Sequence, residues 1–378
     1  MVYADNAATT KISDSVLEKM LPFLQEQYGN ASSQYSLGTK ARRAIENARK
    51  QIALAISAES SEIVFTSGGS EANNWVLKSV VESFNGNRIH VITSSIEHPS
   101  IMNTCRALEI KGVDVTYVPV DNAGRVLVDE VRAAIRSNTK LVSIMLANNE
   151  IGTIQPISEI GNIVRERGIL FHTDAVQAVG HIPVDVIALN IDLLTASAHK
   201  FNGAKGTGFL YIRKDIALSP MILGGEQEQK HRAGTENVAG IVAAGYALEE
   251  SIIDIEKKAA MLIEMTDATI KNITKKIPSS RLNGGTERRL PGIVNFCFEG
   301  VSGESLMHLL DLKKICVSTS SACNTGKNEP SHVLLALGLN EQQAKSAIRI
   351  SYGRDNSFED VDIIVSAIYD SYKKIKDL

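Results

Sequence analysis

Short apolar stretches alternate with longer amphipathic stretches across residues 62–174, and this alternation constrains the fold more than any other feature. Five stretches have the length and apolar content of strands, at residues 62–66, 88–93, 113–119, 141–147 and 169–174. The stretch 141–147 is apolar almost throughout, as expected of a strand buried on both faces of a parallel sheet. We therefore predict an α/β fold with a mostly parallel sheet, in which ligands bind at the carboxyl ends of the strands.

A second pattern begins in the C-terminal third of the chain. Residues 237–276 keep helical periodicity throughout and predict one long helix that bridges two units. Beyond it, residues 293–298 alternate like a half-exposed strand, and shorter helical and strand patterns follow. This part of the chain predicts a smaller α+β unit.

The composition excludes several classes of partner. Lys and Arg number 40 against 43 Asp and Glu, a net charge of −3, so no basic excess indicates nucleic-acid binding. No apolar run reaches the roughly 18 residues of a membrane helix, and the N-terminus has no signal-peptide pattern, so we expect no membrane contact and a cytoplasmic location. We expect no metal site and free thiols, because no CxxC pair occurs among Cys105, Cys297, Cys316 and Cys323.

Lys200 is the strongest candidate for a catalytic side chain. It lies in a turn of small residues between two predicted strands, 191–197 and 208–213. Small residues let a flat ligand approach the backbone, and a lysine held there can form a Schiff base with a carbonyl. Pyridoxal phosphate is the cofactor most often held in this way. The alternative is an ordinary solvated lysine in a loop.

Two further turns carry polar side chains at the ends of predicted strands. After residues 62–66, a Ser/Gly turn runs directly into a helix, so Gly69 and Ser70 are candidates to hold a phosphate at the helix N-terminus. Asp174 ends the strand 169–174, where a carboxylate could keep a pyridine nitrogen protonated, and Gln177 follows one turn later. Both Ser70 and Asp174 are also ordinary helix N-caps, and that alternative stays open.

Four other residues have a chemical and a structural interpretation. His98 follows a strand and could stack on a ring and move protons, or be structural. Asn149 follows the strand 141–147 and could bind cofactor or substrate, or only form a turn. Arg349 lies among apolar residues and could bind a substrate carboxylate, or an Asp or Glu. Cys323 lies in a small, polar stretch typical of a reactive thiol, whereas the other three cysteines lie in core-like patterns.

In this order, these motifs resemble the NifS-like cysteine desulfurases of the class V aminotransferase family, which are pyridoxal phosphate enzymes. The resemblance runs from Tyr-Ala-Asp-Asn-Ala-Ala-Thr-Thr at residues 3–10, through Ser-Ala-His-Lys at 197–200 and Ser-Ser-Ala-Cys at 320–323, to Ile-Arg-Ile-Ser-Tyr-Gly-Arg at 348–354. It implies a fold of the aspartate-aminotransferase type, fold type I. The large domain would span residues 14–255, and the small domain residues 1–13 and 256–378 with the loop of the catalytic cysteine.

The resemblance also implies a role for each candidate residue. Lys200 would be the Schiff-base lysine, His98 the catalytic histidine stacked on the ring, Asp174 the partner of the pyridine nitrogen and Gln177 that of the ring hydroxyl. Cys323 would carry the persulfide, and it is also a candidate transient iron–sulfur ligand. The phosphate would be held by Gly69, Ser70, Ser197, His199 and, from the second subunit of a homodimer, Thr235. The substrate would contact Asn149, which also contacts the cofactor, and Arg349.

The implied reaction converts L-cysteine to L-alanine and passes the sulfur to an acceptor or scaffold protein, for iron–sulfur clusters or for sulfur-containing cofactors and tRNA. The chain departs from the family at Gln34-Tyr35, where a histidine is common, and at Ala204, where a proline is common. Three alternatives stay open: a selenocysteine lyase or cysteine sulfinate desulfinase, a plain aminotransferase in which Cys323 is incidental, and a cofactor-free scaffold or thiol-binding protein.

Overall fold

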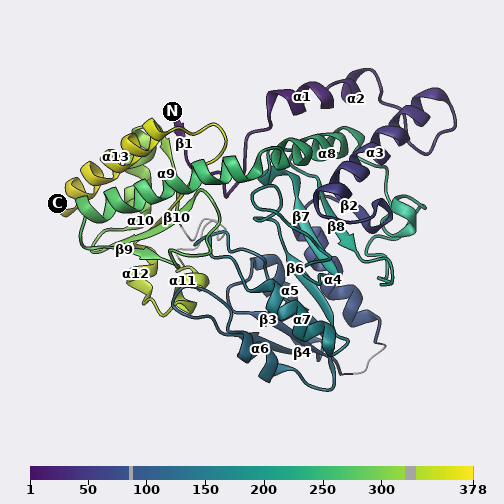
Figure 1. The fold of residues 1–378 in the computed structure, drawn as a ribbon, viewed down its shortest axis with the longest axis horizontal. Coiled ribbons are helices and arrows are strands. Elements are labelled where there is room, and N and C mark those ends of the chain that lie inside the picture. The colour runs from purple at the N-terminus through teal and green to yellow at the C-terminus, as the bar shows by residue number, and fades with distance from the viewer. Residues whose placement is uncertain (85–87, 320–328, 378) are drawn as a thin grey trace.

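The computed structural model describes residues 1–84, 88–319 and 329–377, and its largest element is a seven-stranded sheet (Figure 1). The strand β8 is antiparallel to both of its neighbours, and the other neighbouring pairs are parallel. This arrangement confirms the predicted α/β class with a mostly parallel sheet. The strand order is β2 (Ile63–Thr66), β8 (Gly208–Ile212), β7 (Leu193–Ser197), β6 (Leu170–Asp174), β5 (Thr139–Ser143), β3 (His90–Ser94) and β4 (Asp114–Val118).

Helices cover both faces of this sheet, because its central strands carry apolar side chains on both sides. Leu193 and Leu194 are neighbours in β7 and point to opposite faces, each into a different apolar cluster. One cluster holds the apolar sides of α4 (Gly69–Glu82) and α5 (Pro99–Ile110). The other holds those of α3 (Ser36–Ala55), α7 (Ile157–Glu166) and α8 (Val238–Ile252), with α6 (Val128–Ala134) at its edge. The sheet therefore has a buried interior and leaves its strand ends for ligands.

A second unit is built mainly from the C-terminal part of the chain. Its four-stranded antiparallel sheet has the order β12 (Ser318–Thr319), β13 (Ala347–Ser351), β10 (Ile293–Phe298) and β9 (Ser280–Asn283). The first residues join this unit, because β1 (Val2–Tyr3) pairs with β11 (Ile315–Cys316). Its helices are α9 (Ile255–Lys276), α10 (Gly303–Leu312), α11 (His332–Ala336), α12 (Glu341–Lys345) and α13 (Phe358–Lys376). The unit has an apolar cluster of its own, which supports the predicted small domain, although its boundaries stay a prediction.

Several expected elements differ in the structure. The prediction of a single helix over 237–276 is wrong, because the structure has two helices there. α8 ends at Ile252, and Asp254, with a left-handed φ of 53°, separates it from α9. Near the N-terminus, α1 (Asp14–Met20) is followed by a separate short helix, α2 (Pro22–Gln25), since Pro22 lacks the N–H needed to continue α1. The strand expected over 141–147 begins two residues earlier and ends at Ser143. Within the described ranges, no helix is long and apolar enough to span a bilayer.

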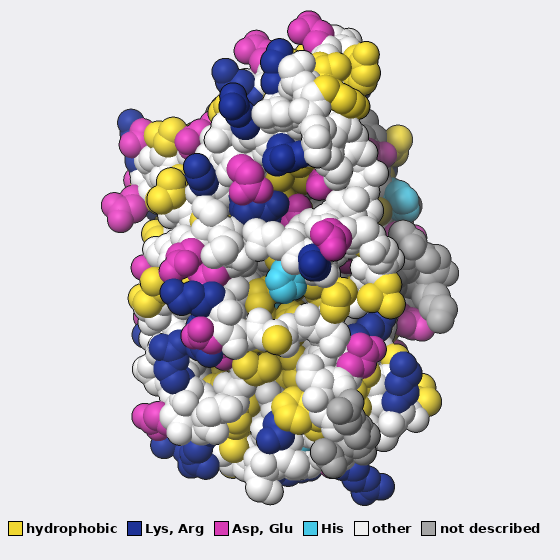
Figure 2. Space-filling view, turned by 90° about the vertical axis from the view of Figure 1, so that its right-hand side faces the viewer, with side chains coloured by type: hydrophobic (Ala, Val, Ile, Leu, Met, Phe, Trp, Pro, Cys, Tyr) yellow, Lys and Arg dark blue, Asp and Glu magenta, His cyan; other side chains and the backbone are white. Residues whose placement is uncertain are grey.

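Charged side chains of both signs are mixed on the face of the molecule that Figure 2 shows. Figure 2 shows one face of the molecule, where lysine and arginine side chains are interspersed with aspartate and glutamate. Such mixed charge agrees with the net charge of −3 and creates no broad positive field for a nucleic acid on this face.

Candidate active site

Lys200 lies where the sequence predicts it, in a short turn at the carboxyl end of β7. The 3-10 turn η2 (Ala198–Lys200) follows the strand directly. Lys200 Nζ donates hydrogen bonds to the carbonyl oxygens of Ala7, at 2.6 Å, and Ala8, at 2.7 Å. The half-buried His181 ring donates from Nε2 to the Lys200 carbonyl at 2.8 Å. The turn is therefore fixed from two directions, by the N-terminal segment and by His181, which sequence reasoning missed.

Asp174, the last residue of β6, lies one strand away from the Lys200 turn. Its side chain is buried and accepts hydrogen bonds from Asn73 Nδ2, at 2.7 Å, and from the backbone N–H of Val176, at 3.0 Å. Gln177, one turn further on, donates to the Ala7 carbonyl at 2.9 Å. The two donors to Asp174 fix its carboxylate at the end of β6, where a pyridine nitrogen could meet it.

His98 is joined to Asp174 through a short chain of polar groups. It caps α5, and the backbone N–H of Ser100 donates to its Nδ1 at 3.1 Å, so the neutral ring carries its proton on Nε2. Ser100 Oγ and Asp174 Oδ2 both accept from the same Asn73 amide. Burial lowers the pKa of His98, Asp174 opposes this, and the Lys200 cation lowers the pKa further. The sequence contained Asn73 in the motif after Ser70, but nothing in the pattern marked it as a contact of Asp174.

Glu97, the residue before His98, is a second group that sequence reasoning missed. Its carboxyl is completely buried and accepts from Ser94 Oγ at 2.5 Å and from the Met145 backbone N–H at 3.0 Å. Burial raises the pKa of Glu97 to about 8, so this carboxyl is mostly protonated at neutral pH. Its backbone carbonyl accepts from His332 Nε2 at 2.9 Å. The turn that carries His98 is therefore held by contacts from both units.

The turn between β2 and α4 has the shape of a phosphate cup. Gly68 has a φ of 144°, and a Cβ added at Gly69 would lie 2.7 Å from Val176 Cγ2, so a larger side chain would fill the cradle. α4 has 14 residues, and its first-turn N–H groups have no partner within the helix. Ser70 is exposed at this end, and an added Cβ at Gly68 would lie 3.5 Å from Ser197 Oγ, so Ser197 borders the cup. The residues present fit a phosphate group.

His199 lies between Ser197 and Lys200 and contacts the N-terminal segment. Its Nδ1 is 3.1 Å from Thr9 Oγ1. Burial and the nearby Lys200 and Lys205 cations lower the pKa of His199 to about 4, so the ring is neutral in the working range of pH. A neutral ring still offers one N–H to an anion, which agrees with the predicted phosphate contact.

Arg349 extends from β13 of the second unit to the turn after β5. Its Nη1 donates to the Asn149 carbonyl at 2.9 Å, and its Nη2 to Asp5 Oδ1 at 2.7 Å. Its Nε is buried without a hydrogen-bond partner among the described residues. Arg349 therefore forms an ion pair with an acidic side chain, Asp5, which was the alternative to a substrate contact. It also places the guanidinium beside Asn149, where both were expected to meet a substrate.

Two candidates are not part of this cluster: Thr235 lies apart from it, and Cys323 lies outside the residues that the structure describes. Thr235 is exposed, in a loop that an ion pair between Arg232 and Glu71 ties to α4. Cys105 and Cys297 are buried, and burial raises the pKa of Cys105 to about 12 and raises that of Cys297, so neither favours a thiolate. In the described ranges, no group of three or more His, Cys, Asp or Glu side chains could hold a metal ion.

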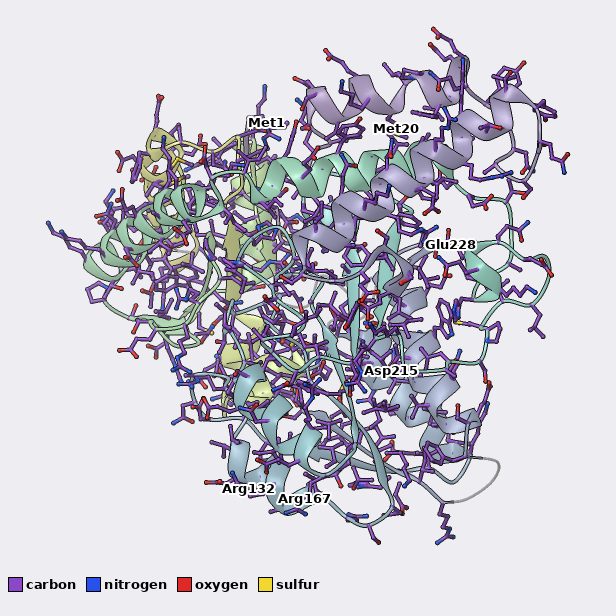
Figure 3. The ribbon with its side chains drawn as sticks, turned by 45° about the vertical axis from the view of Figure 1, so that its right-hand side comes forward. Met1, Met20, Arg132, Arg167, Asp215 and Glu228 are labelled. Carbon is purple, nitrogen blue, oxygen red and sulfur yellow. The ribbon has the colours of Figure 1, made fainter. Side chains whose placement is uncertain are left out.

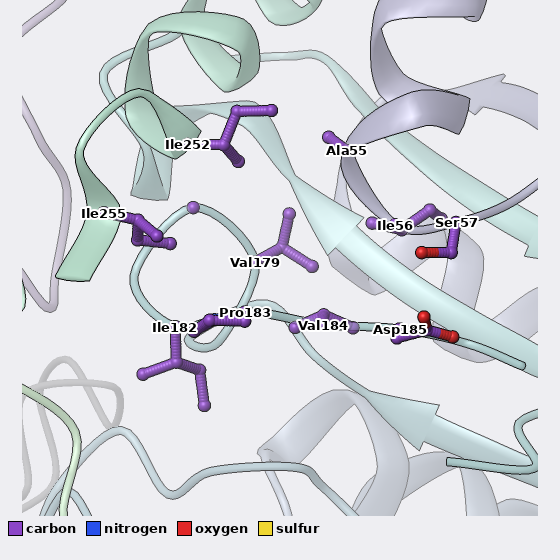
Figure 4. Close-up of a pocket in the computed structure, with 11 residues that line it drawn as sticks. Ala55, Ile56, Ser57, Val179, Ile182, Pro183, Val184, Asp185, Ile252 and Ile255 are labelled. Atoms are coloured by element: carbon purple, nitrogen blue, oxygen red, sulfur yellow. The ribbon is translucent and has the colours of Figure 1, made fainter. Parts of the chain in front are cut away.

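A separate cavity of about 270 Å³ contains none of the predicted site residues (Figure 4). Its walls are mainly aliphatic, from the end of α3, residues 179–185 and the junction of α8 with α9. Asp185 and Ser57 are its polar side chains. The cavity therefore does not belong to the candidate site, although the segment that lines it also carries His181.

A lysine in a strand-end turn, a buried aspartate and a phosphate cup at one sheet edge define a site for pyridoxal phosphate. Residues 2–364 match the family model described as "Aminotransferase class-V", and the chain belongs to that family, whose members depend on this cofactor. Within the family, its relatives are cysteine desulfurases. One from Methanosarcina thermophila, named "Cysteine desulfurase IscS", is 50% identical over 100% of this chain and 93% of its own. Another of that name, from Dictyoglomus turgidum, is 47% identical over 99% of this chain and 95% of its own.

Solved structures agree with this assignment. A "NIFS-LIKE PROTEIN" superposes with a TM-score of 0.92 at 38% identity, covering 98% of both chains. A structure described as "SspA in complex with cysteine" has a TM-score of 0.84 at 39% identity, covering 93% of this chain and 98% of the other. These similarities confirm the predicted fold of the aspartate-aminotransferase type.

Proposed function

We propose that this chain is a pyridoxal phosphate-dependent cysteine desulfurase that carries sulfur on Cys323. The observation that carries the proposal is the convergence of Lys200, Asp174 and His98 beside the phosphate cup at one edge of the sheet. The names of the relatives support cysteine as the substrate. In the balanced reaction, L-cysteine and the Cys323 thiol give L-alanine and a Cys323 persulfide: the C–S bond of the substrate breaks, and an S–S bond forms.

The residues of the site divide the work of holding the cofactor. The N-terminus of α4, Ser70, Ser197 and His199 would bind the phosphate, and Lys200 would bind the aldehyde carbon. When bound, the cofactor supplies an electron sink for the charge that develops at the substrate Cα. The Asp174 carboxylate, fixed by Asn73 and the Val176 N–H, would keep the pyridine nitrogen protonated. Gln177 would contact the ring hydroxyl.

Proton transfer falls to Lys200 and His98. Once substrate replaces it on the cofactor, the Lys200 amine would remove the proton from Cα. His98 has its Nδ1 occupied by the Ser100 N–H, so its exchangeable proton is on Nε2, the atom that can face the reacting groups. The lowered pKa of His98 keeps the ring neutral near pH 7, able both to give and to take a proton.

Arg349 and Asn149 would bind the substrate carboxylate. The guanidinium already pairs with Asp5, so an incoming carboxylate would share it or displace Asp5. A planar fork with several donors can bind two carboxylates at once. We also propose a homodimer, an acceptor or scaffold protein that takes the sulfur for iron–sulfur cluster assembly, and a cytoplasmic location.

One incubation separates this function from the alternatives. The holoenzyme is given L-cysteine without any keto acid, and alanine and sulfide are measured together with and without a thiol reductant. Equal amounts of both products are expected with the reductant. An aminotransferase would make no alanine under these conditions, and a cofactor-free scaffold would make neither product. Parallel reactions with selenocysteine and cysteine sulfinate test the remaining alternative, and a higher kcat/KM with either compound would overturn the choice of substrate.

A further inference from the structure

The loop that carries Thr235 is anchored to the phosphate cup of its own subunit by a buried ion pair. Glu228, which is labelled in Figure 3, lies in the 3-10 turn η3 (Glu228–Lys230) and is buried. Arg49 of α3 binds both of its carboxylate oxygens, from Nη1 at 2.8 Å and from Nη2 at 3.0 Å. The same carboxylate accepts from the Phe65 backbone N–H, at 2.8 Å, in the strand that leads into the cup. One end of the loop is therefore fixed to β2.

The backbone around Glu228 shows how firmly this end is held. Glu228, Gln229 and Lys230 have φ values of 46°, 56° and 70°, all in the left-handed region. Consecutive non-glycine residues in this region carry a conformational cost, and they persist only where surrounding contacts over-determine the chain. The bidentate pair with Arg49 supplies such contacts.

A second ion pair, nearer to Thr235, fixes the loop to α4. Arg232 Nε lies 3.0 Å from Glu71 Oε1, and Arg232 Nη2 lies 3.3 Å from Glu71 Oε2. Glu71 Oε2 also accepts from the Ser67 backbone N–H at 2.8 Å, inside the turn that forms the cup. Hydrogen bonds from Arg232 and Ser67 outweigh burial and lower the pKa of Glu71, so its side chain is ionised.

This pair fixes the segment that leads to Thr235. Glu71 lies in the first turn of α4, and Arg232 is held there by the ion pair. Arg232 also fixes the backbone three residues before Thr235, and Gly234, with a φ of 110°, turns the chain between them. Thr235 itself is exposed, so it is accessible to a second copy of the chain.

We propose that Arg232 is a positioning residue: by pairing with Glu71, it holds Thr235 where it binds the cofactor phosphate of a second copy of this chain. This inference rests on the proposed function, which assigns Thr235 to the partner's phosphate. In each subunit, α4 then has two roles. Its N-terminus forms that subunit's own phosphate cup, and through Glu71 it fixes the loop that carries Thr235 to the partner's cup. Arg232 touches neither cofactor, so its effect reaches the partner's site through Thr235.

The first test is a titration of the apoprotein with pyridoxal phosphate, followed by the emission of the single tryptophan. Trp75 lies in α4, so its quenching reports binding at the cup. Arg232→Gln, Glu71→Gln and Thr235→Ala should each weaken binding about tenfold, as expected for one lost charge-assisted or phosphate hydrogen bond. The double variant Arg232→Gln/Glu71→Gln should be no weaker than either single variant, because both remove one interaction. The matched control is Lys214→Gln, which breaks an exposed ion pair with Glu59 and should leave binding unchanged.

The second test uses mixed dimers to decide which subunit Arg232 serves. A subunit with Arg232→Gln is paired with one carrying Lys200→Ala, and cofactor held by Lys200 is trapped with borohydride at graded concentrations. In this dimer only the Arg232→Gln subunit has Lys200. Its cofactor site is completed by Thr235 of the Lys200→Ala subunit, in which Arg232 and Thr235 are both intact. The concentration for half-maximal labelling should return to the wild-type value, and the same rescue is expected for Thr235→Ala.

Each other outcome overturns a defined part of the reasoning. Labelling that stays about tenfold weaker with Arg232→Gln, while Thr235→Ala is rescued, would mean that Arg232 acts within its own cup, and the inference fails. Failure to rescue Thr235→Ala would refute the shared site itself. Neither result touches the desulfurase assignment, which fails only if the wild-type enzyme makes no alanine from cysteine.

Discussion

Replacing Arg349 with alanine tests the proposed substrate site most directly. The guanidinium lies in a central strand of the second unit with only 6% of its side chain exposed, and it contacts Asp5 and the Asn149 carbonyl. A charged hydrogen bond to a carboxylate in so dry a place contributes about 2–5 kcal/mol. Because Asp5 already shares the guanidinium, the net gain from substrate should lie at the lower end, about 2–3 kcal/mol. At about 1.4 kcal/mol per factor of ten, KM should rise roughly 30- to 140-fold.

The assay measures alanine release over a range of cysteine concentrations, together with the absorbance of the bound cofactor. Arg349→Ala should keep the cofactor spectrum and show its main effect in KM. The matched control is Arg354→Ala, five residues along the chain, whose side chain is 46% exposed and pairs with Glu250. That control should leave KM unchanged. An unchanged KM with Arg349→Ala, accompanied by a lower thermal midpoint, would mean that the pair with Asp5 is purely structural.

The other predictions concern the carboxyl beside His98, the phosphate cup and the sulfur carrier. Because the pKa of Glu97 is about 8 in the folded protein against an ordinary 4.5, the folded chain keeps a proton that the unfolded chain loses between these values. The free energy of unfolding should therefore fall as pH rises from 4.5 to 8, by up to about 1.4 kcal/mol per pH unit from this group, and Glu97→Gln should flatten that decline in urea titrations. Gly69→Ala should weaken cofactor binding, because the new Cβ would meet Val176 Cγ2 at 2.7 Å, and binding as tight as wild type in an equilibrium titration would refute the cup. Cys323→Ser should keep the cofactor but make almost no alanine, and mass spectrometry of the native enzyme after cysteine should find one added sulfur, about 32 Da, on the Cys323 peptide alone.

Sequence patterns predicted the elements of this fold because each pattern is local. The alternation across residues 62–174 gave the strands β2 to β6 within a few residues, and the small residues around Lys200 placed it in a turn between β7 and β8. The break between α8 and α9 escaped prediction, since Asp254 adopts its left-handed conformation without a glycine or proline nearby to mark it. The short strands β1 and β9 were also missed, because two to four residues are too few to show a period.

The contacts within the site could not be predicted, because they join residues far apart in the chain. Asn73 and Asp174 are 101 positions apart, and Arg349 and Asp5 are 344 apart. Periodicity reports which face of an element is buried, but not which element lies opposite. For the same reason, the sequence left Arg349 undecided between a substrate carboxylate and an acidic side chain, and only the pairing of β13 with β10 brings it to the Asn149 turn.

The N-terminal segment connects the two cations on which the proposed reaction depends. The carbonyl groups of Ala7 and Ala8 accept from Lys200, while Asp5, two residues earlier, binds Arg349. These contacts position the Lys200 amine and orient the guanidinium, so the segment influences both the nucleophile and the substrate contact. A shift of residues 5–8 would therefore change the position of Lys200 Nζ and the direction of the Arg349 guanidinium together. This coupling gives a physical reason for the Tyr-Ala-Asp-Asn-Ala-Ala-Thr-Thr stretch to lie across the site, although it contributes no proposed catalytic side chain of its own.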